Sequence, residues 1–417
     1  MNIIVKIGDS TYANLLSATV TSSIENLCNE FSFATSPGIN AKIPIRIGDS
    51  CEVYADKELV LTGFIEAIRG SGSNTSQRLM VQGRDLTCDL ADSHIDVINS
   101  FTGLVTLKKV IESILEHIEL DIEVIDLTSE TLSSTDSSSV TSIDFGEKGT
   151  VSPEPGDNCF KYVDKLARSK SVLLTSNQDG NIEIYRSTFT ADPNRYTITN
   201  QAIDTGANNV LSYNFNYDDT KRFYSYAASG SSNISDFSVF QTGQSFTAAV
   251  DQKGFALDPG GRTFIRQSRR FVIVNENSGE ANNATLRADW ERNIRLARSR
   301  TYGCKLIGFR DKDNNLWSTN SLVRVFDEPA NIDEILLINR VKFSYGSEGA
   351  TTDLELVDRD SYKLASQEEG FRSKKTSGNF GNVFNTYDNK TEDDERPTKE
   401  KVQDLIDKLK ESGDVLG

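Results

Sequence analysis

The chain repeats itself, and this repeat constrains its fold more than any other feature of the sequence. Residues 59–90 begin with an apolar segment, cross a stretch rich in Gly, Ser and Thr, and resume in an alternating segment that ends on an Arg-Asp pair. Residues 335–364 follow the same order. The two pairs are Arg84 with Asp85 and Arg359 with Asp360. Because alternation between turns is typical of antiparallel strands in hairpins, the repeat predicts two related β-units.

The match between the two copies extends upstream of these segments. Residues 16–36 and residues 211–229 both alternate, pass through a polar turn and resume alternating, which predicts one further hairpin in each copy. We therefore expect two related small antiparallel β-barrels. The second barrel is split by an insertion, because the rest of its strands begin only near residue 301.

The insertion contains a predicted helix over residues 279–299. Four apolar residues recur there at the spacing of one helix face: Leu286, Trp290, Ile294 and Ala297. We expect this helix to cap the second barrel. The insertion also contains a cluster of four arginines: Arg262, Arg266, Arg269 and Arg270. They are expected on a solvated or subunit-contacting strand, and docking to an acidic partner surface is the alternative.

Between the two β-units the pattern changes from a period of two residues to that of a helix. Residues 104–118 and 157–169 each place apolar residues on one helix face, and Asp157 is the expected cap of the second helix. Strand-like segments follow both helices. The region is therefore predicted to be a small α/β domain.

The composition changes again after Leu364. A polar stretch broken by Gly and Pro indicates a linker, and a short amphipathic helix is predicted beyond it. The apolar stripe of this helix comprises Val402, Leu405, Ile406 and Leu409. Because so short a helix is marginal alone in water, we expect the stripe to dock on this chain or on a partner protein.

These patterns together predict a β-rich α+β fold with five parts. The first β-barrel is expected over 1–92, the small α/β domain over 93–204, the second β-barrel over 205–233 and 300–366, the insertion with its capping helix over 234–299, and the linker with the C-terminal helix over 367–417.

Reactive side chains gather around the first Arg-Asp pair: Asp85, Cys88, Asp89, Asp92 and His94. A metal site or an acid–base pair is one interpretation, but a zinc site needs more ligands than this segment offers, and the chain has only two histidines. The second copy repeats the Arg-Asp pair and not the other reactive groups. We therefore expect a structural corner, in which Arg84 and Asp85 end the last strand of the first barrel, and no catalytic, cofactor-binding or metal site.

The charge of the chain argues against nucleic-acid binding through phosphate contacts. The chain carries 61 Asp and Glu against 45 Lys and Arg, a net charge of −16, whereas phosphate binding needs a basic face. The five cysteines are odd in number and widely spaced, which favours free thiols. We recognise no signal peptide at the N-terminus, and no apolar run is long enough to span a membrane.

In their order, these segments resemble the baseplate hub proteins of contractile phage tails of the phage Mu type, over roughly residues 1–366. The resemblance is carried by IPIRIGDSCEVYADKELVLTGFIEAI, VQGRDLTCDLADS, NCFKYVDKLARSKSVLL, ADWERNIRLARSR and LWSTNSLVRVFDEPANIDEILLINRVKFSY. It implies a non-enzymatic homotrimer without cofactors, in which two barrels per chain give six barrels around one axis.

The resemblance also implies partners and a location. Such a ring would be a symmetry adaptor between the six-fold tail tube proteins and a trimeric central spike, with baseplate wedge proteins outside. DNA would pass through the lumen only in transit during genome ejection, and an acidic or neutral lumen would not retain it. The protein would be made in the host cytoplasm and reside in the virion, at the tail baseplate.

Two other functions stay open at this point. A tail adhesin or receptor-binding module would need exposed aromatic platforms, whereas Trp290 is expected on a buried helix stripe and Trp317 begins a strand beside a turn. A tail-associated cell-wall hydrolase would need paired carboxylates. Carboxylates are plentiful in the chain, but none is joined to a substrate-groove signature. Host-cell binding or lysis of cell-wall sacculi would distinguish these functions from that of a hub.

Overall fold

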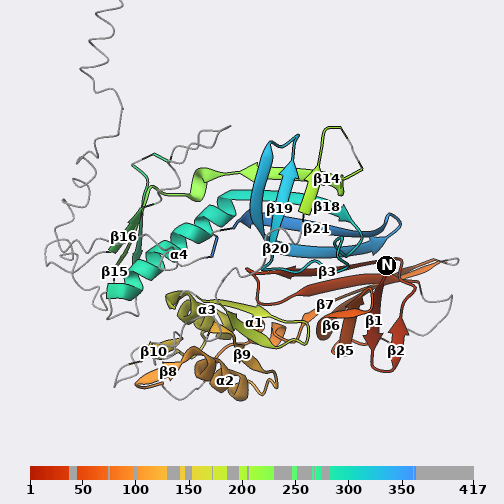
Figure 1. Cartoon of the computed structure of the whole chain (residues 1–417). Coiled ribbons are helices and arrows are strands. Elements are labelled where there is room, and N and C mark those ends of the chain that lie inside the picture. The colour runs from red at the N-terminus through yellow and green to blue at the C-terminus, as the bar shows by residue number, and fades with distance from the viewer. Residues whose placement is uncertain are drawn as a thin grey trace, which may run out of the picture. The chain divides into compact units, whose positions relative to one another are not determined.

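The computed structural model of the chain (Figure 1) describes residues 1–36, 45–73, 76–96, 101–128, 141–145, 153–170, 172–185, 197–203, 206–229, 247–250, 265–266, 268–274, 281–359 and 361–362. Strands dominate these residues, as the alternation predicts. One sheet has 13 strands, and three small sheets and four α-helices accompany it in the described part of the chain. The predicted β-rich α+β character is thereby confirmed.

The first unit of the large sheet has the strand order β3-β4-β7-β6-β5-β1. All neighbours in it are antiparallel, and β2 (Ser10–Tyr12) pairs with β1 at the outer edge. Buried side chains alternate with less buried ones along most of these strands, which gives the sheet a core face. The strand bounds are β1 Ile3–Ile7, β3 Ser17–Ser23, β4 Glu30–Thr35, β5 Ser50–Ala55, β6 Glu58–Gly72 and β7 Gln77–Asp85.

The second unit repeats this order as β14-β18-β21-β20-β19-β13. It departs from the first unit in that β13 runs parallel to β19, whereas β1 runs antiparallel to β5, and in that no described strand pairs with β13 as β2 does with β1. The strand bounds are β13 Thr197–Asn200, β14 Val210–Tyr217, β18 Arg300–Ile307, β19 Leu322–Asp327, β20 Ile332–Gly346 and β21 Gly349–Asp358.

A β-bulge occurs at the same place in both units and gives the register of the repeat. The pairing of β6 with β7 shifts after Ile65, and that of β20 with β21 shifts after Ile338. Counted from these bulges, Asp85 of the first unit corresponds to Asp358 of the second. The predicted twin, Asp360, is therefore displaced by two residues, because a two-residue shift leaves the alternation of a strand unchanged.

The two units are joined edge to edge by antiparallel pairing of β20 with β3. Figure 1 shows this junction between the blue strands of the second unit and the red strands of the first. One apolar core spans both units, with Phe33, Val81 and Leu61 from the first packed in the same cluster as Leu356 and Ile338. The path of pairings runs from β14 to β2, and in the described residues no pairing closes either unit into a barrel.

The hairpin predicted within residues 211–229 is wrong. The partner of β14 is β18, whereas β15 (Ser225–Ser229) pairs with β16 (Thr247–Val250) and β17 (Arg270–Val274) in a separate sheet. Alternation marks a strand but does not identify its partner, and the polar turn between the two segments forms the short 3-10 helix η2 (Asp219–Lys221).

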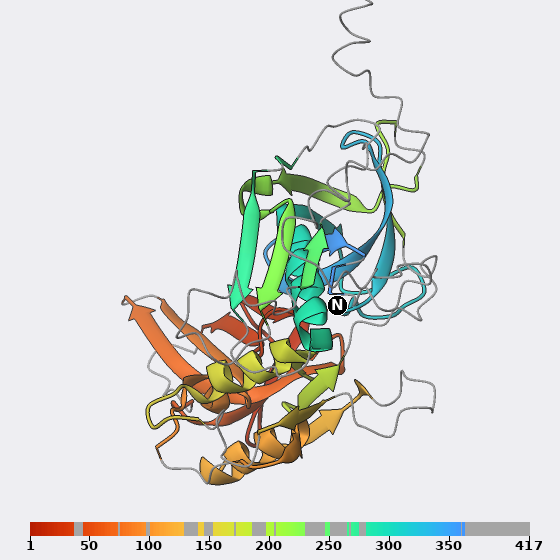
Figure 2. The same cartoon turned by 90° about the vertical axis from the view of Figure 1, so that its left-hand side faces the viewer.

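Helix α4 (Ala281–Ser299) confirms the helix predicted in the insertion. Its Trp290, Ile294 and Ala297 are buried in one cluster with Leu337 and Val357 of the second unit. The side chain of Leu286 lies outside the described residues. Figure 2 shows the helix beside the small sheet of β15, β16 and β17.

The middle region contains both predicted helices and a core of its own. The predicted helices are α2 (Leu107–His117) and α3 (Cys159–Ser169), and the short helix α1 (Cys88–Asp92) was not predicted. Val110, Ile114, Val163 and Leu166 lie in that core. Asn158 rather than Asp157 caps α3, because its side chain accepts a hydrogen bond from the backbone NH of Lys161. The strands are β8 Leu104–Thr106, β9 Val124–Asp126, β10 Ser142–Asp144, β11 Leu173–Ser176 and β12 Ile182–Tyr185.

The helices of the described residues are too short or too polar to cross a lipid bilayer.

Candidate functional site

The carboxylate of Asp85 lies buried at the end of β7 and joins three segments of the chain. One of its oxygens, Oδ2, accepts hydrogen bonds from the backbone NH of Asn29 at 2.7 Å and from Ser176 Oγ at 2.5 Å. The other, Oδ1, accepts from Thr87 through its backbone NH at 3.2 Å and its hydroxyl at 2.6 Å. Burial raises the pKa of Asp85, and these hydrogen bonds oppose that rise. With both oxygens engaged by the protein, the group is suited to hold a corner rather than to transfer a proton.

Arg84 points to the other face of β7 and links the bulge to α1. Its guanidinium donates to Glu66, the extra residue of the bulge, from Nε at 2.8 Å and from one NH2 at 2.6 Å. The same group donates to Asp92 of α1 at 2.5 and 3.2 Å. The hydrogen bonds to Glu66 and then to Asp92 raise the pKa of Arg84, and Arg84 in turn lowers the pKa of Asp92. The Arg-Asp pair therefore connects the first unit to the middle region through both residues.

The other reactive groups of this segment do not converge on one point. Cys88 is buried in α1, and burial raises the pKa of its thiol to about 12. His94 instead forms an isolated β-bridge with Asn158. Among the described residues no group of three His, Cys, Asp or Glu side chains is placed to hold a metal ion. All five cysteines are free thiols.

The remaining predicted residues fall in different parts of the chain. Arg359 directly follows the end of β21, whereas Asp360 lies outside the described residues. Arg262 and the predicted docking stripe also lie outside them, the stripe being Val402, Leu405, Ile406 and Leu409. Arg269 of the basic cluster donates to the backbone carbonyl of Thr220 and lies over the ring of Phe223, so it contributes to packing within the chain.

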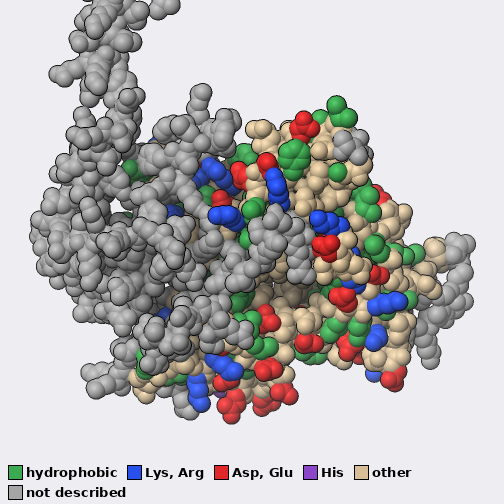
Figure 3. All heavy atoms as spheres, viewed as in Figure 1, with side chains coloured by type: hydrophobic (Ala, Val, Ile, Leu, Met, Phe, Trp, Pro, Cys, Tyr) green, Lys and Arg blue, Asp and Glu red, His purple; other side chains and the backbone are tan. Residues whose placement is uncertain are grey.

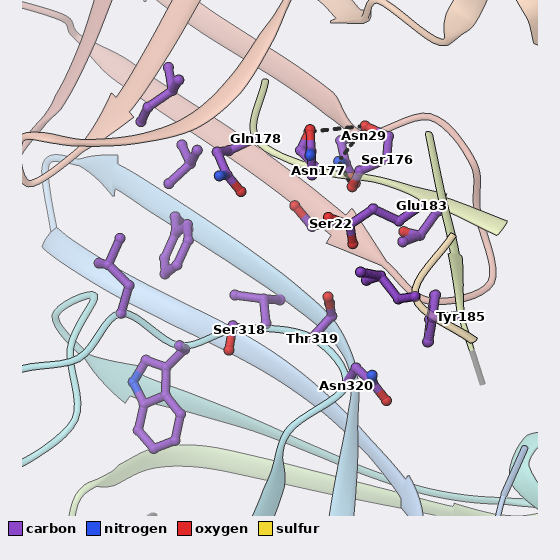
Figure 4. Close-up of a pocket in the computed structure, with 18 residues that line it drawn as sticks. Ser22, Asn29, Ser176, Asn177, Gln178, Glu183, Tyr185, Ser318, Thr319 and Asn320 are labelled. Carbon is purple, nitrogen blue, oxygen red and sulfur yellow. Dashed lines mark hydrogen bonds between the residues drawn. The ribbon is translucent and has the colours of Figure 1, made fainter. Parts of the chain in front are cut away.

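A polar crevice of about 500 Å³ lies where the two units and the middle region meet (Figure 4). In Figure 4 Asn29, Ser176 and Asn177 lie on one side of it, and Ser318, Thr319 and Asn320 lie on the other. Glu183 is half-buried at its wall, and burial raises the pKa of this carboxyl while a hydrogen bond from Asn177 opposes the rise. The lining combines hydroxyl and amide groups with apolar side chains such as Leu127, Trp317 and Phe343, so it does not single out one class of ligand.

The clearest candidate for an interaction surface is the edge strand β14. Within the described residues β14 pairs with β18 on one side and with no strand on the other. Its aromatic side chains are exposed, with Tyr213 at 40%, Phe215 at 51% and Tyr217 at 54%. Sequence reasoning missed this surface because aromatic alternation in 211–217 indicates a strand with a buried face. An exposed aromatic row on an unpaired sheet edge is typical of a protein contact.

On the face of the molecule drawn in Figure 3, neither sign of charge excludes the other. Figure 3 shows basic and acidic side chains intermixed on the face in view, with acidic groups more numerous over the α2 side of the middle region. The exposed acidic residues there are Glu112, Glu116, Glu119, Asp121 and Glu123. A mixed surface of this kind does not suit binding along a phosphate backbone.

Family models match two stretches of the chain that form most of the large sheet. Residues 2–85 match the N-terminal domain of Mu phage baseplate assembly protein GpP-like, and residues 280–365 match the fourth domain of Mu phage baseplate assembly protein GpP. These two stretches contain the first unit and most of the second.

Proteins that are similar over most of the chain are also phage or prophage tail proteins. The baseplate hub protein gp44 of Escherichia phage Mu is 25% identical over 377 residues, which cover 88% of this chain and 90% of that protein. The 43 kDa tail protein of prophage MuSo2 from Shewanella oneidensis has a similar fold, with a TM-score of 0.67 and 24% identity over 87% of this chain and 100% of that one. A tail protein from Neisseria meningitidis MC58 gives a TM-score of 0.68 and 19% identity over 87% and 97%. Together the domain models and the full-length likeness support the predicted resemblance of this chain to the phage Mu-type baseplate hub family.

Proposed function

We propose that the chain is the structural hub of a contractile-tail baseplate and that it acts as a homotrimer. The observation that carries the proposal is the duplicated strand order, in which two units of one plan stand edge to edge in one sheet. Three such chains contribute six similar units, and we propose that each unit is one small barrel of the ring, although the strand pairings of the described residues leave both units open. The likeness to the Mu hub protein supports the same conclusion.

The ring is proposed to act as a symmetry adaptor. A six-fold symmetric tail tube can make equivalent contacts with a three-fold symmetric spike only if a component between them has three subunits and six near-equivalent faces. Duplicated units in a trimer satisfy both requirements. The tail tube proteins would contact one side of the ring, the trimeric central spike the other, and baseplate wedge proteins the outside.

The division of the chain follows from this arrangement. We assign the barrels to 1–92 and to 205–233 with 300–366, the α/β domain to 93–204, the insertion to 234–299 and the linker with its helix to 367–417. Two strands depart from these bounds: β13 (Thr197–Asn200) joins the sheet of the second barrel, and β15 (Ser225–Ser229) pairs with the strands of the insertion. Arg84 and Asp85 then form the hinge between the first barrel and the α/β domain, which the hydrogen bond from Ser176 to Asp85 supports. Arg84 holds helix α1, at the end of the first barrel's range, through Asp92. The stripe of the C-terminal helix would dock on this body or on a partner.

The net charge of −16 has a role in this proposal. If the ring surrounds the DNA exit channel, acidic or neutral walls keep DNA from being retained during ejection. Particles whose hub carries neutral substitutions at lumen-facing acidic positions should eject DNA more slowly in a dye-uptake assay. Ejection at the wild-type rate would contradict this role of the charge.

The mass of the full chain in solution tests the trimer. Light scattering should give three times the chain mass of 46.1 kDa, and averaged electron micrographs should show six similar lobes with three-fold symmetry. A chain that stays monomeric up to high concentration, or that closes with another number of subunits, would contradict the proposal. Lysis of cell-wall sacculi by the purified protein would overturn its non-enzymatic part.

A host-binding function is the second candidate, because exposed Tyr213, Phe215 and Tyr217 could form an aromatic platform for a ligand. Trp290 and Trp317 do not contribute to it, since both are buried. The variant Phe215→Ser separates the two functions. Loss of host-cell binding with an intact trimer would favour the adhesin, whereas loss of the trimer would favour the hub.

A further inference from the structure

The joint inside the chain shows how one unit accepts the edge of another. The second half of β20, beyond the end of its pairing with β19, pairs antiparallel with β3 through Arg340–Tyr345. Phe343 faces Val20 and Tyr345 faces Ala18 in this joint. Large side chains on the β20 side thus meet small ones on the β3 side.

The repeat places a second copy of each of these edges elsewhere in the chain. The strand that corresponds to β20 is β6, whose pairing with β5 ends at Phe64, so that in the described residues its segment 67–72 pairs with β7 alone. The strand that corresponds to β3 is β14, which in the described part of the chain pairs with β18 alone. The free edges of β6 and β14 in the described residues therefore correspond to the edges of β20 and β3 that form the internal joint.

We infer that, in the trimer proposed above, β14 of one subunit pairs antiparallel with residues 67–72 of β6 in the next and repeats the internal joint. This inference rests on the proposed function. Transferring the register of the internal joint through the matched bulges places Gly70 opposite Phe215 and Gly72 opposite Tyr213.

The side-chain sizes across the inferred joint fit this pairing. Phe215 and Tyr213 occupy the positions of Val20 and Ala18, which are 1% and 2% exposed in the internal joint. Their rings need space on the opposite strand, and glycine at 70 and 72 leaves it. In the internal joint the large side chains lie on β20 and the small ones on β3. In the inferred joint the large side chains lie on β14, the counterpart of β3, and the small ones on β6, but each large residue still faces a small one.

Gly70 has no other evident reason to be glycine. A Cβ atom at this position would meet only a side-chain carbon of Leu79, at the ordinary contact distance of 3.9 Å. Its backbone also lies outside the left-handed region that favours glycine. The space above it is therefore available to a neighbouring subunit at no cost to the fold of this one.

A head-to-tail contact between β14 and β6 pairs large side chains with small ones, and such a contact generates a closed ring when its rotation closes. A joint between two copies of the same edge would instead link two subunits symmetrically, which does not build a three-membered ring.

An engineered disulfide tests the register directly. Ser71 and Asn214 face each other in the inferred joint, as Ser344 and Thr19 do in the internal one. Directly opposed strand residues lie within disulfide range, so the variant Ser71→Cys with Asn214→Cys should form a covalent trimer on oxidation. A mixture of the two single variants should give only covalent dimers. The matched control, Thr19→Cys with Ser344→Cys, should close within one chain.

A second variant separates this inference from the trimer itself. Gly70→Glu places a charged side chain where Phe215 would pack and should convert the trimer into folded monomers. Ile307→Glu, at an exposed apolar position of β18, is the control and should remain trimeric. A wild-type trimer that is unaffected by Gly70→Glu and forms no Ser71–Asn214 crosslink would overturn the inferred joint and leave the proposed hub standing. A wild-type chain that never trimerises would overturn both.

Discussion

The hydrogen bonds of Asp85 connect residues that are far apart in the sequence: the residue itself at the end of β7, Asn29 before β4, and Ser176 at the end of β11. Replacing a buried carboxylate that accepts hydrogen bonds from several donors lowers the stability of the fold, because each donor loses its acceptor. The sequence drew attention to this position through the Arg-Asp pair, although the residue that corresponds to Asp85 in the second unit is Asp358 and not Asp360. It could not indicate Ser176, since only the folded chain brings β11 to this corner.

Replacing the carboxylate with an amide of the same shape should destabilise the fold. In Asp85→Asn, the amide NH2 would face the donors that now point at one oxygen. The free energy of unfolding should fall by about 1–3 kcal/mol, measured by urea unfolding. The exposed neighbour Asp89 provides the control, since Asp89→Asn should leave stability within about 0.5 kcal/mol of wild type.

The same carboxyl should give stability a pH dependence. Burial raises the folded pKa of Asp85 above its ordinary value of 3.8, so the folded state holds the proton more tightly than the unfolded state. The contribution is therefore complete below pH 3.8 and is lost as pH rises through the folded pKa. The stability difference between wild type and Asp85→Asn should shrink with rising pH across this window. A difference that grows would show that the hydrogen bonds outweigh burial.

Two glycines of neighbouring strands should respond oppositely to alanine. A Cβ atom at Gly83 would lie 2.0 Å from the carbonyl oxygen of Phe64 and 2.6 Å from the ring of Phe31, so Gly83→Ala should cost about 3 kcal/mol or more. Gly70→Ala meets no such obstacle and should leave the thermal midpoint of the monomer unchanged or slightly raised. Equal effects of the two substitutions on the melting temperature would contradict this account.

At the scale of elements, the sequence predicted which segments are strands or helices better than it predicted their partners. The helix of 279–299 was predictable because its face recurs at helical spacing, and α4 lies within those bounds. The partner of β14 was not, because β18 follows only after the whole insertion. The true register of the repeat was not predictable either, because matching Asp85 to Asp360 instead of Asp358 leaves the alternation of buried and exposed residues unchanged. Only the bulges after Ile65 and Ile338 reveal the difference.

Helix α4 should depend on one large side chain for its attachment to the second unit. Trp290 is 2% exposed among residues of that unit, so Trp290→Ala should lower the free energy of unfolding by about 3–5 kcal/mol. Hydrogen exchange should show faster exchange along α4 than along the first unit. Arg298→Ala serves as the control because this side chain is 56% exposed and its ion pair with Glu25 lies at the surface. A stable α4 in Trp290→Ala would show that its other contacts suffice.

At the scale of the whole molecule, the duplication was readable from the sequence and the sharing of one sheet was not. Nothing in the alternation of β3 or β20 says that these two strands pair, because their residues are more than three hundred positions apart. The aromatic row of β14 could likewise be recognised as an interaction surface only from the structure, in which the described residues leave this strand edge unpaired.

Subunit association should make thermal stability depend on the concentration of the chain. If folded chains are linked through β14, mass action raises the thermal midpoint as concentration rises. Phe215→Ser should abolish this dependence and leave the midpoint near that of the dilute wild type. Scanning calorimetry over a hundredfold range of concentration measures it. A concentration dependence that survives in Phe215→Ser would place the contact elsewhere.

The pairing of β3 with β20 also bears on how the chain is synthesised. The partner of β3 leaves the ribosome only after almost all of the described chain has emerged, so the edge of β3 stays open throughout translation. An open edge invites pairing with strands of other nascent chains. The residues that β3 presents there, such as Ala18, Val20 and Ser22, are small, whereas the aromatic edge of β14 emerges in the second half of synthesis. During translation the chain therefore exposes the β3 edge, with its small side chains, first, and the aromatic β14 edge, which is more prone to pair with other chains, only later.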